Sequence, residues 1–216
     1  LEALELVPPE ILRYLIASTK PKKAITFDAG MSLVELADEY ERMASRDIDS
    51  ELKDETLSRR QKVAVEDAEG AIRMSSIGNM KQSNVTFRHL SMLAQVKSDE
   101  EIIQSVGPEV ADRLGRMRNW INGPHFPDEL KIRVLDERVE GLDSTIVKAL
   151  HTQISQCEWD AKSIGEAISS AFRDSEINTK EGYRTLYQAI LGVEKGPRLA
   201  PIMVELERNH VLKLLG

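Results

Sequence analysis

The stretch that decides the fold is residues 180–203, which read KEGYRTLYQAILGVEKGPRLAPIM. Its first half places apolar residues three and four positions apart, which is the spacing of one helical face. The members of this first stripe are Tyr183, Leu186, Tyr187, Ile190 and Leu191. Gly192 then predicts the end of the helix, because glycine readily takes the left-handed conformation of a C-cap.

A second helix is expected directly after this turn. Gly196-Pro197 predicts its start, with Pro197 in the first helical turn. Its apolar stripe is Leu199, Ile202, Met203 and Leu206. Lys195 and Arg198 stand where free amides at a helix start favour an anion. Spacing alone favours a plain helical hairpin with solvated charges.

Helical patterning continues through most of the chain. Besides the hairpin, helices are expected from residue 8 to 19, from 32 to about 44, and over 87–98, 99–107, 108–121, 143–157 and 161–173, with a tail helix that ends at Leu215. Residues 63–83 are weakly patterned, and residues 128–141 predict either a short strand or an extended loop. We therefore predict a nearly all-α fold, a multi-helix bundle or α-helix cage preceded by a small helical segment. A break near 80–86 or 122–141 is the expected subdomain boundary.

Composition limits the classes of function. The net charge of −7 argues against a protein that coats nucleic acid non-specifically, although it permits a local basic patch. Cys157 is the single cysteine, which excludes an intramolecular disulfide and a cysteine-based zinc site. No apolar run approaches the ~20 residues of a membrane span. Because the chain opens in mid-pattern without Met, we expect a fragment of a longer protein.

Residues with catalytic or metal-binding spacing are not found in the sequence. The four histidines are scattered and none has the spacing of metal ligands. Neither a Gly-x-Ser-x-Gly elbow nor a phosphate-binding glycine loop is present. Residues 73–79, RMSSIGN, loosely echo the Lys-Met-Ser-Lys-Ser loop of class I aminoacyl-tRNA synthetases, but they lack the second lysine. The sequence therefore predicts no catalytic and no metal-ligating residues.

Several stretches together resemble class I lysyl-tRNA synthetase, downstream of its signature ATP loop. They are residues 5–16 (ELVPPEILRYLI), 19–28 (TKPKKAITFD), 34–42 (VELADEYER), 87–90 (FRHL), 119–121 (NWI), 187–192 (YQAILG) and 196–199 (GPRL). The last two stretches resemble the anticodon region of that family, and glutamyl-tRNA synthetases have a similar ending. The resemblance runs along nearly the whole chain.

The resemblance implies a fragment with a stem-contact segment (1–80) followed by an α-helical anticodon-binding domain (81–216). The parent enzyme would attach lysine to tRNA(Lys) using ATP. Its catalytic domain would lie outside this fragment, which would be inactive alone and bind no cofactor itself. The expected partner is tRNA(Lys), with no DNA and no membrane, and the protein would be a cytoplasmic monomer.

The resemblance also assigns site residues. Tyr187, Gly196, Pro197 and Arg198 would read the anticodon, because unpaired bases stack on aromatic or arginine planes and hydrogen-bond at their edges. Trp120 is a further stacking candidate; its alternative role is in the core, and the ring of Tyr187 has the same alternative. Lys20, Lys22 and Lys23 would contact phosphates at the inner corner of the tRNA, which position it without reading sequence. The alternative for these lysines is a solvated loop.

Two other functions stay open from the sequence. One is the corresponding region of a glutamyl-tRNA synthetase, which would prefer tRNA(Glu). The other is a helical protein-interaction module, which would bind an amphipathic partner helix and no tRNA. Salt dependence of binding separates this module from both tRNA-binding functions.

Overall fold

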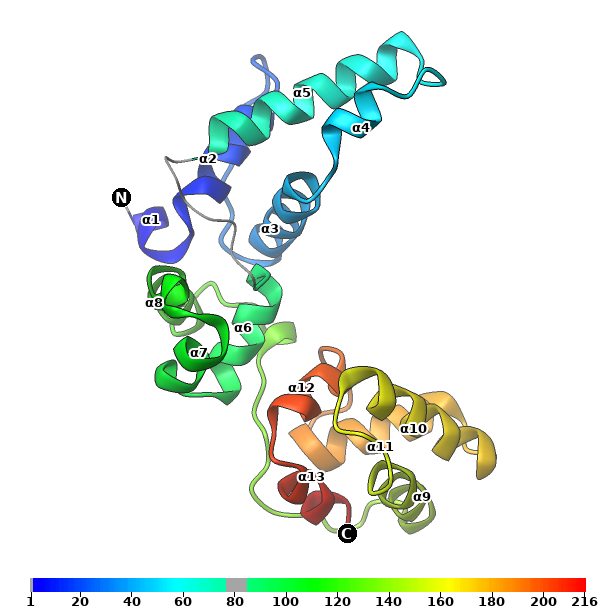
Figure 1. The fold of residues 1–216 in the computed structure, drawn as a ribbon. Helices are drawn as coiled ribbons and strands as arrows, with labels where there is room; N and C mark the ends of the chain where they lie inside the picture. Colours follow the sequence, from blue (N-terminus) through cyan, green and yellow to red (C-terminus); the bar gives the residue numbers. More distant parts are fainter. Residues whose placement is uncertain (1, 77–84) are drawn as a thin grey trace. The chain divides into compact units, whose positions relative to one another are not determined.

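The computed structural model describes residues 2–76 and 85–216 of the chain. Over these residues the fold is all-α and contains no β-strand, which confirms the predicted fold class (Figure 1). The helices are α1 (Glu2–Leu6), α2 (Pro9–Ser18), α3 (Met31–Ala44), α4 (Ile48–Leu52), α5 (Arg59–Ser75), α6 (Phe87–Val96), α7 (Asp99–Val106), α8 (Ala111–Ile121), α9 (Ser144–Ile154), α10 (Ala161–Asp174), α11 (Thr179–Leu191), α12 (Leu199–Glu205) and α13 (Arg208–Leu215). Two short 3-10 turns, η1 (Pro108–Val110) and η2 (Asp128–Leu130), complete them.

Two compact units make up the chain. Unit 1 comprises Leu1–Ala94 and Ser98–Pro127, and unit 2 comprises Gln95–Lys97 and Asp128–Gly216. The change of unit after Pro127 lies inside the break predicted for 122–141. The functional division into segments 1–80 and 81–216 is a different one, because residues 85–94 and 98–127 fold with unit 1. That functional division stays a prediction.

Helix α2 begins in unit 1 as the sequence predicts, with proline in its first turn. It packs against α3 and α5, and Figure 1 shows α2 beside α5. Ile11 and Tyr14 form its buried side. Glu10 lies in the first turn of α2, where it is buried and paired with Arg113 of α8.

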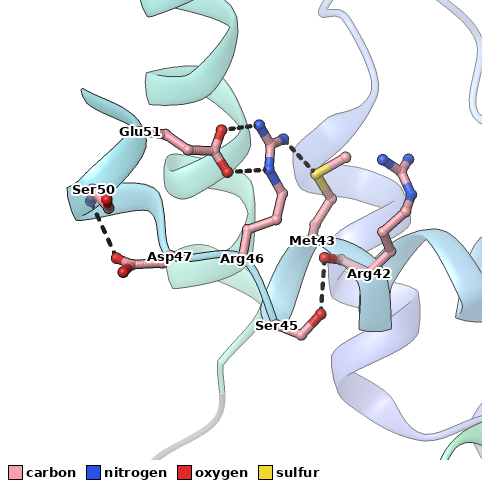
Figure 2. Close-up of polar contacts among 7 residues, drawn as sticks. All are labelled: Arg42, Met43, Ser45, Arg46, Asp47, Ser50 and Glu51. Atoms are coloured by element: carbon pink, nitrogen blue, oxygen red, sulfur yellow. Dashed lines mark hydrogen bonds and ion pairs between the residues drawn. The ribbon is translucent and has the colours of Figure 1, made fainter. Parts of the chain in front are cut away.

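A bidentate ion pair orders the link between α3 and α4 (Figure 2). Arg46 Nε donates to Glu51 Oε1 at 2.8 Å, and Arg46 Nη2 donates to Glu51 Oε2. The hydrogen bonds from Arg46 lower the pKa of the Glu51 carboxyl. Asp47 caps α4 by accepting from the backbone N–H of Ser50 at 3.1 Å. The acidic residues of this link therefore serve local structure.

Helices α7 and α8, with α6 as far as Ala94, complete unit 1. Ser98 and Glu101 form the reciprocal capping box that the sequence predicts at the start of α7. Leu114, Met117 and Trp120 of α8 are buried, as their spacing predicts. The aromatic centre of unit 1 is the indole of Trp120, with ring centroids 5.2 Å from Phe87 and 4.8 Å from Phe126.

Unit 2 consists of helices α9 to α13 and the connector that precedes them. Asp143, Asp160 and Asn178 cap α9, α10 and α11 by accepting backbone N–H bonds. The fully buried side chains come from several of these helices: Leu150, Ile154, Ile164, Leu186, Ile190, Ile202, Val211 and Leu214. Residues 180–203 therefore supply α11 and α12 to a packed helical core (Figure 1).

The structure resolves two points that the sequence left open and corrects one local prediction. Helix α5 continues to Ser75, through residues whose sequence is weakly patterned. The connector 128–141 contains η2 and no strand among its residues, so the extended loop is the correct alternative. Helix α12 begins at Leu199, so Pro197 lies before the helix and not in its first turn. The loop signals predicted at 78–79 and 83–84 lie outside the described residues.

Candidate nucleic-acid interface

Helix α11 is the scaffold of the candidate site. Its buried side, with Leu186 and Ile190 both 0 % exposed, fixes it in the core of unit 2. Gly182 lies so close to α10 that an added Cβ would stand 2.4 Å from Cε1 of Phe172. A side chain at position 182 would therefore collide with the Phe172 ring, so that the ring or one of the helices would have to shift.

The turn after α11 follows from Gly192. This residue has φ 69° and ψ 15°, the left-handed conformation predicted for the C-cap. Its backbone N–H donates to the Gln188 carbonyl at 3.2 Å. The connector also binds the end of α11, because the Leu135 backbone N–H donates to the Ile190 carbonyl at 3.0 Å. The last turn of α11 is thus fixed from both sides.

Tyr187 holds the turn from residue 193 to 198 through its hydroxyl. The Tyr187 Oη is 3.0 Å from the Gly196 carbonyl oxygen and 2.7 Å from the Pro197 carbonyl oxygen. The single phenolic proton is therefore shared between two backbone acceptors of the turn. Burial raises the pKa of the Tyr187 phenol, and the neighbouring Tyr183 phenol adds to the rise. The structure thus brings three of the predicted anticodon residues together.

Arg198 follows these carbonyls and is exposed. Its backbone occupies the N-cap position of α12 without a side-chain cap bond. Three exposed cations belong to the same hairpin, namely Lys180, Arg184 and Lys195. Among the residues that the structure describes, none of these four cations has a carboxylate within 4.0 Å. Their charges are therefore available to an external anion.

Trp120 does not lie at a surface. Its side chain is 0 % exposed, and its Nε1 donates to the Ala29 carbonyl at 2.6 Å. A base cannot reach either face of this indole in the described fold. The core alternative is the one the structure supports, so Trp120 is left out of the candidate interface.

Lys20, Lys22 and Lys23 lie in the exposed loop between α2 and α3 of unit 1. The Lys23 backbone N–H donates to the Lys20 carbonyl at 2.9 Å, which closes a tight turn. The three lysines, which are close together in sequence, therefore lie on one exposed loop. Their predicted role in phosphate binding is neither supported nor opposed by this geometry, and it stays a prediction.

Tyr183 is an exposed aromatic residue of α11 to which the sequence assigned no role in the site. Its spacing assigns it to the apolar stripe of α11, but it is 36 % exposed. The ring of Phe172 lies against it, at 5.2 Å between centroids and 77° between planes. Periodicity gives the face of the helix but not where the core ends along its axis, so no sequence signal separates Tyr183 from Leu186.

Metal ligation and membrane insertion find no support in the part of the chain that the structure describes. No group of three or more His, Cys, Asp or Glu side chains there is arranged to hold a metal ion. His210, one of the scattered histidines, is bonded through Nε2 to the Leu135 carbonyl at 2.8 Å. None of the described helices is both long and apolar enough to cross a bilayer.

Comparison with known proteins gives the class first. The family model described as class I (K) tRNA synthetases matches residues 1–68. The chain is therefore similar to a class I aminoacyl-tRNA synthetase in its first third.

More specifically, the similar curated proteins are lysine–tRNA ligases. Those of Thermoplasma volcanium and Picrophilus torridus are 28 % and 26 % identical, and each match covers 98 % of this chain. The ligase of Archaeoglobus fulgidus is 26 % identical over 92 % of the chain. The chain spans only 42 %, 43 % and 39 % of these proteins, respectively. The chain is thus similar along nearly its whole length to lysine–tRNA ligases, which confirms the resemblance read from the sequence.

Proposed function

We propose that this chain is the tRNA-binding, C-terminal region of a lysyl-tRNA synthetase. One observation carries the proposal: 98 % of the chain matches a lysine–tRNA ligase of which it spans 42 %. In the proposed whole enzyme, lysine is activated with ATP and transferred to tRNA(Lys). ATP and lysine would bind outside these 216 residues, and the chain alone would have no ligase activity. We further propose a cytoplasmic monomer that binds neither DNA nor a membrane.

Within this proposal the 193–198 turn of unit 2 reads the anticodon. Unpaired bases in an RNA loop offer their edges for hydrogen bonds and their faces for stacking. The guanidinium of Arg198 can supply both interactions. Since the Tyr187 hydroxyl bonds to the carbonyls of Gly196 and Pro197, these two residues would also position Arg198.

The charge distribution supports a local contact. The chain as a whole carries a net charge of −7, which opposes broad attraction to a polyanion. The cations Lys180, Arg184, Lys195 and Arg198 instead gather in one hairpin without ion-pair partners among the described residues. Lys20, Lys22 and Lys23 would add contacts to tRNA phosphates from unit 1. Binding is thereby expected to depend on salt in proportion to a small number of phosphate contacts.

The experiment that tests this function compares tRNA(Lys) with tRNA(Glu) in filter binding over a series of salt concentrations. We expect tighter binding of tRNA(Lys) and a linear fall of log affinity with log salt. Arg198→Ala should weaken tRNA(Lys) binding by about 1–3 kcal/mol, the range for a base-reading arginine. Arg173→Ala is the matched control, because Arg173 is an exposed arginine of unit 2 that already pairs with Asp174.

Other results would assign the chain differently. A preference for tRNA(Glu) would favour the glutamyl-tRNA synthetase alternative. Absence of salt-dependent tRNA binding would reject both synthetase functions and leave the helical interaction module. Equal effects of Arg198→Ala and Arg173→Ala would remove Arg198 from the site while leaving tRNA binding intact.

A further inference from the structure

Two large apolar side chains of unit 2 are exposed among its described residues, Tyr183 at 36 % and Val193 at 44 %. Both belong to the hairpin that carries the candidate interface. Exposed aromatic groups beside cations are the usual components of a surface that binds single-stranded nucleic acid. A single exposed leucine needs no explanation, whereas an exposed tyrosine beside cations points to a bound ligand.

The side chain of Tyr183 is partly open to a ligand, because the residue is 36 % exposed. Its contact with Phe172 is edge-to-face, at 77° between the ring planes. In such a contact Phe172 covers at most one face of the Tyr183 ring. In the part of the chain that the structure describes, the Tyr183 hydroxyl has no hydrogen-bond partner. Tyr187 differs, because its hydroxyl is engaged with the turn.

Helical spacing places the cations around this ring. Lys180 lies three residues before Tyr183 and Tyr187 lies four residues after it, so these three residues share one face of α11. Arg184 lies four residues after Lys180, at the edge of the same face. Lys180 and Arg184 are both exposed. Since Tyr187 binds the carbonyls of Gly196 and Pro197, the turn that leads to Arg198 lies against the same face.

We propose that Tyr183 is the aromatic residue that stacks on an unpaired base of tRNA(Lys), with Lys180 and Arg184 contacting the adjoining phosphates. The choice of ligand follows from charge complementarity, because a stacked base brings two flanking phosphates and the face offers two unpaired cations. An amphipathic protein helix would need a wider apolar strip than one exposed ring. This inference rests on the proposed function and replaces Tyr187 and Trp120 as the stacking groups.

The test uses tRNA(Lys) transcripts that carry 2-aminopurine at one anticodon-loop position at a time. Stacking on an aromatic ring quenches the fluorescence of this base analogue, so quenching reports contact and not only affinity. We expect quenching at one or two loop positions with the unchanged chain and with Tyr183→Phe, which keeps the ring. Tyr183→Leu keeps an apolar contact with Phe172 but has no aromatic face. It should lose the quenching and bind tRNA(Lys) about 5- to 150-fold more weakly.

Thermal unfolding of each variant shows whether the fold survives. Tyr183→Met serves as a second apolar replacement if Tyr183→Leu does not fold. Quenching and affinity equal to those of the unchanged chain in a folded Leu or Met variant would overturn the role of Tyr183, while tRNA binding by the proposed function would stand. A chain that binds no tRNA(Lys) would overturn both the inference and the proposed function.

Discussion

The buried carboxylate of Glu10 on α2 pairs with the guanidinium of Arg113 on α8, although the two residues are 103 positions apart. Glu10 is 4 % exposed, and its Oε2 has no hydrogen-bond partner among the described residues. One carboxylate oxygen is therefore satisfied by Arg113 and the other is not. Such a pair is costly to break, because loss of one member leaves a buried charge.

We expect Arg113→Met to lower the free energy of unfolding by about 3–5 kcal/mol. The double variant Glu10→Met with Arg113→Met should lower it less, because no buried charge is then left unpaired. Urea unfolding in a Trp159→Phe background measures this effect in unit 1, since Trp120 is then the reporting fluorophore. Arg116→Met is the control, because the Arg116 pair with Asp112 is partly exposed and worth at most about 1 kcal/mol. Equal costs for Arg113→Met and Arg116→Met would contradict the argument.

The Glu10–Arg113 pair illustrates what the sequence could not predict. Cap positions such as Gly192 and the Ser98–Glu101 box were predicted correctly, because their chemistry is complete within a few residues. A pair between α2 and α8 depends on how distant helices pack, and that is not encoded in local spacing. From its neighbours alone, Glu10 is therefore an ordinary first-turn acid.

Helix α5 shows a different limit. Its capping box at Ser58 and Gln61 is regular, but over seventeen residues it buries only Val65, Ala71 and Ser75. The apolar stripe is too sparse to be recognised, and Val63 is 46 % exposed. In the candidate site, likewise, the sequence predicted the hairpin and its turn residues. The proposed assignment of base stacking to Tyr183 and not to Tyr187 rests on where the core ends along α11 and on the Tyr187 hydrogen bonds to the turn, which helical spacing does not give.

Tyr14 should give a pH dependence of stability at alkaline pH. Burial, followed by the carboxylate of Glu39, raises the pKa of the Tyr14 phenol to about 12. The folded state therefore retains a proton that the unfolded state releases near pH 10. The resulting stabilisation is complete below about pH 10 and is lost as the pH rises towards 12.

Comparison with Tyr14→Phe isolates this contribution. Between pH 9 and pH 12 the unfolding free energy of the unsubstituted chain should fall by about 1–3 kcal/mol relative to that of Tyr14→Phe. Tyr14→Phe also lacks the hydrogen bond from the Tyr14 hydroxyl to Glu39, at 3.2 Å, and this adds a difference in unfolding free energy below pH 10 that does not vary with pH. A difference that stays constant across this range would show that Tyr14 titrates normally.

Trp120 should behave as a core residue and not as a base-stacking one. Trp120→Ala is expected to cost about 3–5 kcal/mol of stability, as for other large buried aromatic residues. Trp120→Phe keeps much of the packing with Phe87 and Phe126 but leaves the Ala29 carbonyl unpaired, at a cost of about 1–3 kcal/mol. Chemical denaturation gives these costs. Folded Trp120→Phe should bind tRNA(Lys) as the unsubstituted chain does; selectively weaker binding would restore Trp120 to the site.

The loop lysines should act on affinity without reading sequence. Replacing Lys20, Lys22 or Lys23 by Gln should weaken binding of tRNA(Lys) and tRNA(Glu) alike and reduce the salt slope by about one for each phosphate that is no longer bound. Stability should change by no more than about 0.5 kcal/mol, because all three side chains are exposed. Lys162→Gln, on α10 with a side chain 85 % exposed, is the matched control. Salt slopes identical to that control would assign Lys20, Lys22 and Lys23 to a solvated loop.

Tyr187 should position Arg198 through the turn. Tyr187→Phe keeps the ring but removes the hydroxyl that binds the carbonyls of Gly196 and Pro197, which should lower stability by about 0.5–1.5 kcal/mol. Without this bond the turn can move, so the affinity for tRNA(Lys) should fall as well.

A double-mutant cycle that combines Tyr187→Phe with Arg198→Ala tests whether Tyr187 affects tRNA(Lys) binding through Arg198. If Tyr187 acts through Arg198, Tyr187→Phe should weaken tRNA(Lys) binding in the unsubstituted chain and have almost no effect once Arg198 is alanine. Filter binding of the four chains measures the coupling, with thermal unfolding to confirm that each is folded. Additive effects would mean that Tyr187 contacts the RNA on its own account, as the family resemblance implies. A non-additive effect would assign the hydroxyl to the turn and leave base stacking to Tyr183.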